Sequence, residues 1–153
     1  MKKATEFLQK ATDELLSLMS VKGKAEISYD KTEDVFTVNI EAGDTTGLLI
    51  GKKGETLSSL QTFLGIALKQ HLGEWKRVVV NVGDYREKEE DYLKNLADST
   101  ATRAIESKEP QSLYNLKAWQ RRIIHMHLSE NPDITTESVG EGEERYLVVK
   151  SKR

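Results

Sequence analysis

Hydrophobic residues follow two different periods along the first half of the chain. Residues 4–20 repeat them at helical spacing, whereas residues 25–29 and 35–40 alternate apolar and polar positions and predict a β-hairpin. A short helix over 44–50, capped by Asp44, should follow. Another helical stripe extends to about residue 72, and residues 76–82, with three consecutive valines, predict a buried strand. The predicted order is helix, strand, strand, helix, helix, strand.

Two glycines enclose two lysines between the two helices of this middle region. The stretch is Gly51-Lys52-Lys53-Gly54. Glycine lacks a Cβ and lets another backbone come close, while the free N–H groups at a helix start favour an anion. The stretch therefore predicts a clamp for a phosphate backbone. Gly51 and Gly54 would permit the approach, and Lys52 and Lys53 would contact phosphates.

The spacing of the glycines restricts the kind of clamp. Nucleoside-triphosphate loops need G-x-x-x-x-G-K-[ST] and dinucleotide sites need G-x-G-x-x-G, and neither pattern fits. The stretch from Ile50 to Gly54 fits the I-G-x-x-G signature of KH domains, whose loop clamps about four nucleotides. Those residues alone would equally suit a plain helix–turn–helix corner. The element order decides, because it is that of a type II KH domain.

A KH domain holds single-stranded nucleic acid in a groove beside this loop. Leu49, Ile50 and Leu57 are the candidates for its apolar floor, although at least one of the three is expected to be only core. No aromatic residue is placed to stack a base there. Affinity should therefore depend on backbone contacts, with modest sequence preference.

The second half of the chain predicts another small α+β domain. A helix should begin near Arg86 with Leu93, Leu96, Ala97, Ala101, Ala104 and Ile105 on one face, and Pro110 should end it. A short extended piece over 111–114, a helix over 116–129 capped by Asn115, and strands over 134–139 and 144–150 follow. The predicted domains are residues 1–83 and 84–153, the second being two helices on a three-stranded sheet.

The helix over 116–129 carries a second group of candidate binding residues. Leu116, Trp119, Ile123 and Met126 should form its apolar side. Arg121 and His125 lie four residues apart on the opposite side, with Arg122 nearby, and such donors suit phosphate oxygens. One alternative stays open, namely that Arg121 pairs with an acid of the preceding helix.

Chemistry is poorly supported by these residues. His125 has no evident carboxylate partner or nucleophile, and His125 and His127 point to different faces, which argues against a zinc pair. No paired carboxylates or cysteines occur. We therefore expect no catalytic residues, no metal and no cofactor.

Charge is unevenly distributed along the 153 residues, although the net charge is only −2. Residues 47–83 hold five Lys or Arg against two acids, and residues 110–129 hold three against none. Two basic patches on an acidic body can bind a phosphate chain locally. No apolar run approaches the roughly 18 residues of a membrane span, and the N-terminus lacks a signal-peptide core. A cytoplasmic protein without membrane insertion is expected.

Arg121-Arg122-Ile123-Ile124-His125 contains R-x-x-x-H, the signature of a small domain associated with single-stranded nucleic acids. A type II KH domain followed by this R-x-x-x-H domain resembles the bacterial Jag family, also called KhpB, EloR or SpoIIIJ-associated protein. The resemblance covers residues 24–150. It implies RNA binding, a role in cell elongation or division through post-transcriptional control, and partnership with a small KH-only protein. Binding of single-stranded DNA and a homodimer remain open.

Two departures from the family pattern accompany the resemblance. Members usually carry a further N-terminal Jag domain and a charged linker, and regulation through that region is not assigned here. The usual glutamate before the arginine pair is Gln120, and Glu87-Lys88 replace common basic residues. The predicted function is single-stranded RNA binding without chemistry. The alternative is a protein-interaction adaptor that pairs with a small KH protein.

Overall fold

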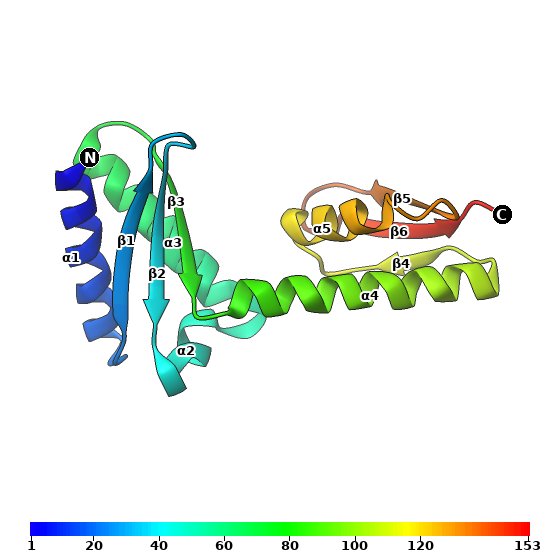
Figure 1. Cartoon of the computed structure of the whole chain (residues 1–153), viewed down its shortest axis with the longest axis horizontal. Coiled ribbons are helices and arrows are strands. Elements are labelled where there is room, and N and C mark those ends of the chain that lie inside the picture. The colour runs from blue at the N-terminus through cyan, green and yellow to red at the C-terminus, as the bar shows by residue number, and fades with distance from the viewer. The chain divides into compact units, whose positions relative to one another are not determined.

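The structure is a computed structural model that describes residues 1–153 and divides into two compact units, Met1–Arg86 and Glu87–Arg153 (Figure 1). Each unit combines helices with its own three-stranded sheet, which confirms the predicted α+β class. The predicted boundary followed residue 83. The units divide slightly later because Tyr85 contacts Gly54, and Arg86 donates hydrogen bonds to Gln61 and Val80 of the first unit.

The first unit has the element order that its sequence predicts. Its elements are α1 (Lys2–Leu18), β1 (Lys24–Asp30), β2 (Val35–Glu41), the 3₁₀ turn η1 (Gly43–Thr45), α2 (Thr46–Ile50), the 3₁₀ turn η2 (Lys52–Gly54), α3 (Glu55–Leu72) and β3 (Arg77–Val82). The sheet order is β1-β2-β3, with β1 antiparallel and β3 parallel to β2. A parallel neighbour requires a long crossover, and the crossover between β2 and β3 carries the glycine loop.

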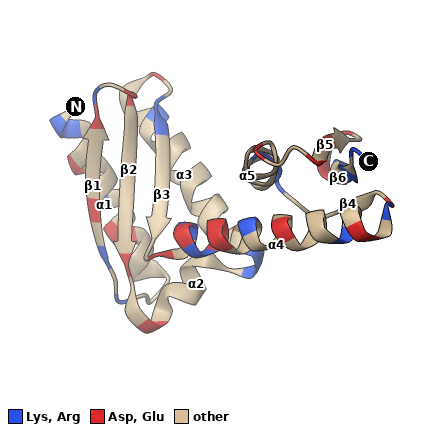
Figure 2. Cartoon of the chain, turned by 45° about the vertical axis from the view of Figure 1, so that its right-hand side comes forward, with Lys and Arg blue, Asp and Glu red and all other residues tan.

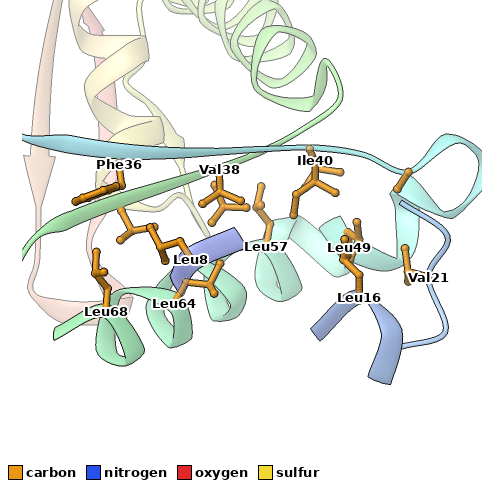
Figure 3. Packing of buried hydrophobic residues seen from close by; sticks show 14 of the residues in the cluster. Leu8, Leu16, Val21, Phe36, Val38, Ile40, Leu49, Leu57, Leu64 and Leu68 are labelled. Carbon is orange, nitrogen blue, oxygen red and sulfur yellow. The ribbon is translucent and has the colours of Figure 1, made fainter. Parts of the chain in front are cut away.

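The helices of this unit share one hydrophobic core with the sheet. Phe36, Val38 and Ile40 alternate along β2 and point into it (Figure 3). Leu8 of α1 and Leu64 of α3 pack in the same cluster. The helical period of α1 and α3 and the two-residue period of β2 therefore meet in one layer, as amphipathic elements require.

The second unit contains most of α4 (Tyr85–Ser107), then β4 (Gln111–Leu113), α5 (Ala118–Leu128), β5 (Ile134–Val139), the 3₁₀ turn η3 (Gly142–Glu144) and β6 (Tyr146–Ser151). Its sheet order is β4-β6-β5, all antiparallel. Its core cluster is Leu93, Ala97, Ala101, Ala104, Ile124, Leu128, Ile134, Leu147 and Val149. No helix of the chain combines the length and the apolar character needed to cross a membrane.

Both predicted caps are wrong. Asp44 lies inside η1, and the N-cap of α2 is Thr45, which makes no side-chain capping bond to the helix. Asn115 adopts φ 58° and lies outside α5, where a left-handed turn suits asparagine. The helix begins at Ala118 instead, and the backbone N–H of Lys117 donates to Gln120 Oε1 at 2.7 Å.

The predicted apolar row of α5 is also wrong. The buried row lies one residue later and consists of Gln120, Ile124 and Leu128, whereas Trp119 is 42% and Met126 59% exposed. A polar Gln120 misleads a pattern based on hydrophobicity. It is tolerated in the core because Lys117 N–H binds its Oε1 and its Nε2 donates to Glu89 at 3.0 Å. Ile105, assigned to the apolar face of α4, is likewise 40% exposed.

A polar network ties the β1–β2 hairpin to the segment before β3. Lys76 Nζ lies 2.7 Å from Asp34 Oδ2 and 3.5 Å from Glu74, and Tyr29 Oη donates to Asp34 Oδ1 at 2.6 Å. The hydrogen bond from Lys76, followed by that from Tyr29, lowers the pKa of the Asp34 carboxyl. The same partner raises the pKa of Lys76.

We predict that Asp34→Ala lowers the thermal midpoint of the first unit at neutral pH. Because the folded-state pKa of Asp34 is lowered, its contribution to stability is present above the ordinary carboxyl pKa of 3.8 and is lost as pH falls through the lowered pKa. The difference between the midpoints of variant and wild type should therefore vanish at strongly acidic pH. Thermal unfolding over a series of pH values measures it.

Glu33→Ala is the matched control, because Glu33 lies in the same hairpin and its carboxylate has no ion pair in the structure. Its midpoint should stay close to that of the wild type at each pH. A deficit in Asp34→Ala that persists unchanged at strongly acidic pH would contradict the assignment.

Candidate nucleic-acid interface

The loop between α2 and α3 uses three residues with positive φ. Gly51 has φ 70°, Lys53 has φ 53° and Gly54 has φ 72°. Gly51 N–H closes α2 by donating to Gly47 O at 2.9 Å, and Gly54 N–H donates to Gly51 O at 3.4 Å. Such φ values are strained for residues with a Cβ. The loop therefore needs glycine at both ends, as the sequence indicates.

The two glycines face protein rather than open space. A Cβ on Gly51 would overlap Thr56 Oγ1, and a Cβ on Gly54 would lie 2.8 Å from Tyr85 Oη. Gly54 is buried, whereas Gly51 is half-buried. The expectation that both glycines leave room for a bound strand is thus wrong for Gly54. Its missing side chain makes room for Tyr85, the first residue of α4.

The lysines between them have the opposite environment. Lys52 and Lys53 are exposed, and neither takes part in an ion pair. A tight turn whose ends are fixed from below therefore displays two cations to solvent. The residues predicted to line an apolar groove divide into two classes. Leu49 and Leu57 are 0% and 6% exposed and belong to the core, so Leu57 cannot be a contact residue.

Ile50 is half-buried and stays a candidate for the groove floor. The exposed apolar neighbour is Leu48, 62% exposed, which the sequence did not single out. Its position between two glycine-flanked turns gave no periodic signal. The apolar surface at this loop is therefore Leu48 with part of Ile50.

The edge of the sheet next to α3 presents further polar groups. Gln61 Oε1 accepts a hydrogen bond from Val80 N–H at 3.1 Å and one from Arg86 at 3.3 Å, and Arg86 also reaches Val80 O at 3.5 Å. Burial, and then the charge of Arg77, lower the pKa of the Arg86 guanidinium, which remains charged because arginine is not deprotonated in proteins. Sequence reasoning missed Gln61 and Arg86 as surface groups near the loop, because their partners come from β3.

In the second unit, Arg121 is fixed by backbone carbonyls. Its Nη1 donates to Leu116 O at 2.6 Å and to Arg145 O at 3.4 Å. A guanidinium has five N–H donors, and those on Nε and Nη2 have no bond in the structure. Arg121 therefore holds two segments together and still presents part of its donor fork.

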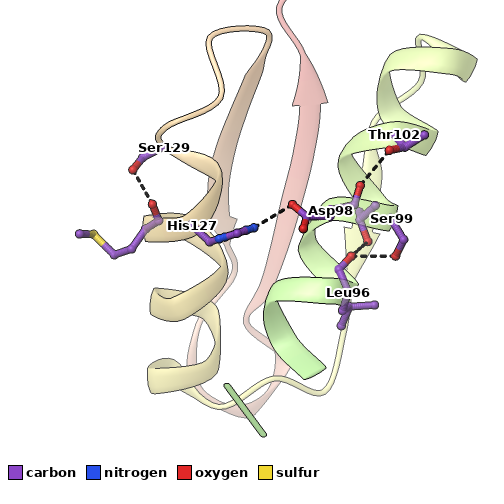
Figure 4. A network of polar contacts seen from close by, with 8 residues as sticks. Leu96, Asp98, Ser99, Thr102, His127 and Ser129 are labelled. Carbon is purple, nitrogen blue, oxygen red and sulfur yellow. Dashed lines mark hydrogen bonds and ion pairs between the residues drawn. The ribbon is translucent and has the colours of Figure 1, made fainter. Parts of the chain in front are cut away.

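The open alternative for Arg121, an ion pair with an acid of the preceding helix, is wrong. The acids of α4 instead contact Gln120 and His127, and His127 Nε2 lies 2.7 Å from Asp98 Oδ1 (Figure 4). These two contacts fix α5 against α4. They leave Arg121 on the other flank of the helix.

The remaining predicted residues lie on the outer side of α5. Arg122 and His125 are exposed, and His125 Nδ1 is hydrogen-bonded to Thr136 Oγ1 of β5, which leaves Nε2 for a ligand. Arg121 and His125 are one helical turn apart, so the structure brings the three predicted side chains to one side of α5. The segment carries no acid, whereas α4 alternates both charges (Figure 2).

The structure thus defines a class of protein. Its first unit has the element order and glycine loop of a type II KH domain, and its second unit has the sheet and Arg/His helix of an R-x-x-x-H domain. The family model of the KhpA/KhpB KH domain matches residues 5–82, and that of the R-x-x-x-H domain matches residues 91–151. The chain belongs to the KhpA/KhpB KH family and is of the KhpB, or Jag, type.

Curated relatives agree with this assignment. The RNA-binding protein KhpB of Clostridium symbiosum is 32% identical over 99% of this chain and 66% of its own length. That of Bacillus subtilis is 35% identical over 88% of this chain and 65% of its own length. The chain therefore spans just under two thirds of these relatives. A solved structure of Aquifex aeolicus Era covers 52% of this chain and 29% of its own at 20% identity, with a TM-score of 0.34, too low for any conclusion.

We predict that Gly54→Ala destabilises the first unit by about 1–3 kcal/mol, because alanine is strained at φ 72° and its Cβ would crowd Tyr85 Oη. Denaturant unfolding measures the loss. Gly47→Ala is the matched control, since a Cβ there meets nothing within 4 Å and Gly47 lies in a helix without positive φ. It should be neutral or stabilise by up to about 1 kcal/mol.

Combining Gly54→Ala with Tyr85→Phe separates the two causes. Removing Oη leaves ring carbons at 3.5 Å, an ordinary contact distance, so part of the loss should be recovered. Equal losses in both backgrounds would show that Tyr85 does not restrict this position.

Proposed function

We propose that this protein binds single-stranded RNA without catalysing a reaction, through the glycine loop of its KH domain and the Arg/His side of α5. The observation that carries the proposal is the loop itself, where Lys52 and Lys53 extend to solvent from a turn that Gly51 and Gly54 fix against the protein. Relatives named RNA-binding protein KhpB support it. The contact residues are Ile50, Gly51, Lys52, Lys53, Arg121, Arg122 and His125, with Gly54 in a supporting role.

The chemistry of both patches favours a phosphate backbone over a base sequence. Lysine ammonium groups at a loop tip and a partly free guanidinium on α5 are donors without nearby acceptors of their own. Such groups attract phosphates, and a short loop fits a strand whose bases are unstacked. We therefore expect modest sequence preference. A role in post-transcriptional control of cell elongation or division, in the cytoplasm, is part of the proposal.

We predict that replacing Lys52 and Lys53 with Asp abolishes crosslinking to single-stranded RNA. Each reversal turns an attraction for phosphate into a repulsion, and the thermal midpoint should hardly change because both side chains are exposed. Lys2→Asp with Lys3→Asp is the matched control, an adjacent exposed pair in α1 with the same charge change. This control should crosslink like the wild type.

The salt dependence of affinity belongs to the same experiment. Wild-type affinity should fall steeply as salt rises, and the loop variant should show a smaller slope because fewer counterions are released. Crosslinking that survives in the loop variant, or a flat salt response of the wild type, would remove the loop from the account.

Pairing with a small KH-only protein is the second candidate function, and one observation favours it. Phe63 and Ile66, one turn apart on α3, are 53% and 49% exposed, which is unusual for large apolar side chains on neighbouring positions. Trp75, 60% exposed, lies against Gly65 between them. An apolar surface of this kind suits a protein partner, including a second copy of the chain.

We predict that Ile66→Asp weakens this pairing, because the partner would have to bury a carboxylate. Sizing of the chain alone and with a small KH-only protein, before and after nuclease treatment, measures it. Leu18→Asp is the control, since Leu18 is an 83% exposed residue of α1. Complexes that vanish with nuclease would show that RNA, rather than this surface, joins the proteins.

A further inference from the structure

Trp119 is an exposed indole without a partner. It is 42% exposed, does not belong to the core cluster of the second unit, and takes part in no ring stacking, cation–π contact or hydrogen bond. The next residue, Gln120, is buried in its place. A large aromatic side chain normally contributes to a core or an interface. Its position on the outside of α5 therefore calls for a ligand.

The surroundings of Trp119 indicate the chemistry of that ligand. Arg122 follows one turn later and Met126 one turn beyond that, and both are exposed. Residues 110–129 contain no acid. Glu89, the carboxylate that reaches α5 from α4, is engaged by Gln120. An aromatic face next to an unpaired guanidinium suits an unstacked base together with its phosphate.

The other exposed aromatic side chain in this unit has a different setting. Tyr114 is 62% exposed, but its ring already contacts Tyr146 at 4.9 Å. Tyr146 follows the turn that holds Glu141, Glu143 and Glu144, and these carboxylates would repel a phosphate chain. Charge complementarity therefore selects Trp119 over the tyrosine pair.

We infer that Trp119 is a base-stacking residue of the R-x-x-x-H domain, which holds one unpaired base of a single strand while Arg122 contacts the adjacent phosphate. The inference rests on the proposed function and adds to it a contact that the Arg/His signature does not contain. It also gives the second domain an aromatic platform, which the glycine loop of the KH domain lacks.

Tryptophan fluorescence tests this inference directly, because the chain has only Trp75 and Trp119. In Trp75→Phe the emission comes from Trp119 alone. Titration with a mixed-sequence single-stranded RNA of about 12 nucleotides should quench it. A double-stranded RNA of the same length should not, since its bases are already stacked. In Trp119→Phe the emission comes from Trp75 and should change little.

Affinity measurements complete the test. Trp119→Ala should bind the single strand about five- to hundredfold more weakly than wild type, and Trp119→Phe should retain most of the affinity because a phenyl ring still stacks. Circular dichroism and the thermal midpoint should be unchanged, since Trp119 lies outside the core. Unchanged affinity in Trp119→Ala together with unquenched emission in Trp75→Phe would overturn the inference and leave the proposed function standing. A wild type that binds no RNA would overturn both.

Discussion

The contact between Gly54 and Tyr85 is the constraint on which the first domain's surface depends. Because the tyrosine hydroxyl occupies the space a Cβ would need, the chain must turn at Gly54 with a positive φ, and Lys53 must do the same just before it. The turn leaves Lys52 and Lys53 no neighbours to pair with. A fixed backbone with free cations at its tip follows from packing rather than from flexibility.

Charge placement gives the second domain a comparable surface by different means. The acids of α4 are used inside the domain, where Glu89 accepts from Gln120 and Asp98 contacts His127. Gln120 can donate to Glu89 where the family's usual glutamate would repel it, so this departure from the pattern has a local reason. The outer side of α5 remains cationic. A chain with net charge −2 can thus present two basic patches.

Element order and type could be predicted from periodicity, because α1, α3 and β2 each bury one regular face. The orientation of α5 could not, since two rows one residue apart compete and the buried one contains a glutamine whose partners come from other segments. The role of Gly54 was equally hidden, because Tyr85 is distant in sequence. Motif residues could be located, whereas their partners required the fold.

The most direct test of the account is an amide NMR titration of the chain with single-stranded RNA. The account predicts that the amide signals of residues 47–54 and of α5 shift together with the proposed contacts, while those of β1 stay in place. Shifts confined to other elements, or none at saturating RNA, would contradict the claim that the glycine loop holds a nucleic-acid backbone.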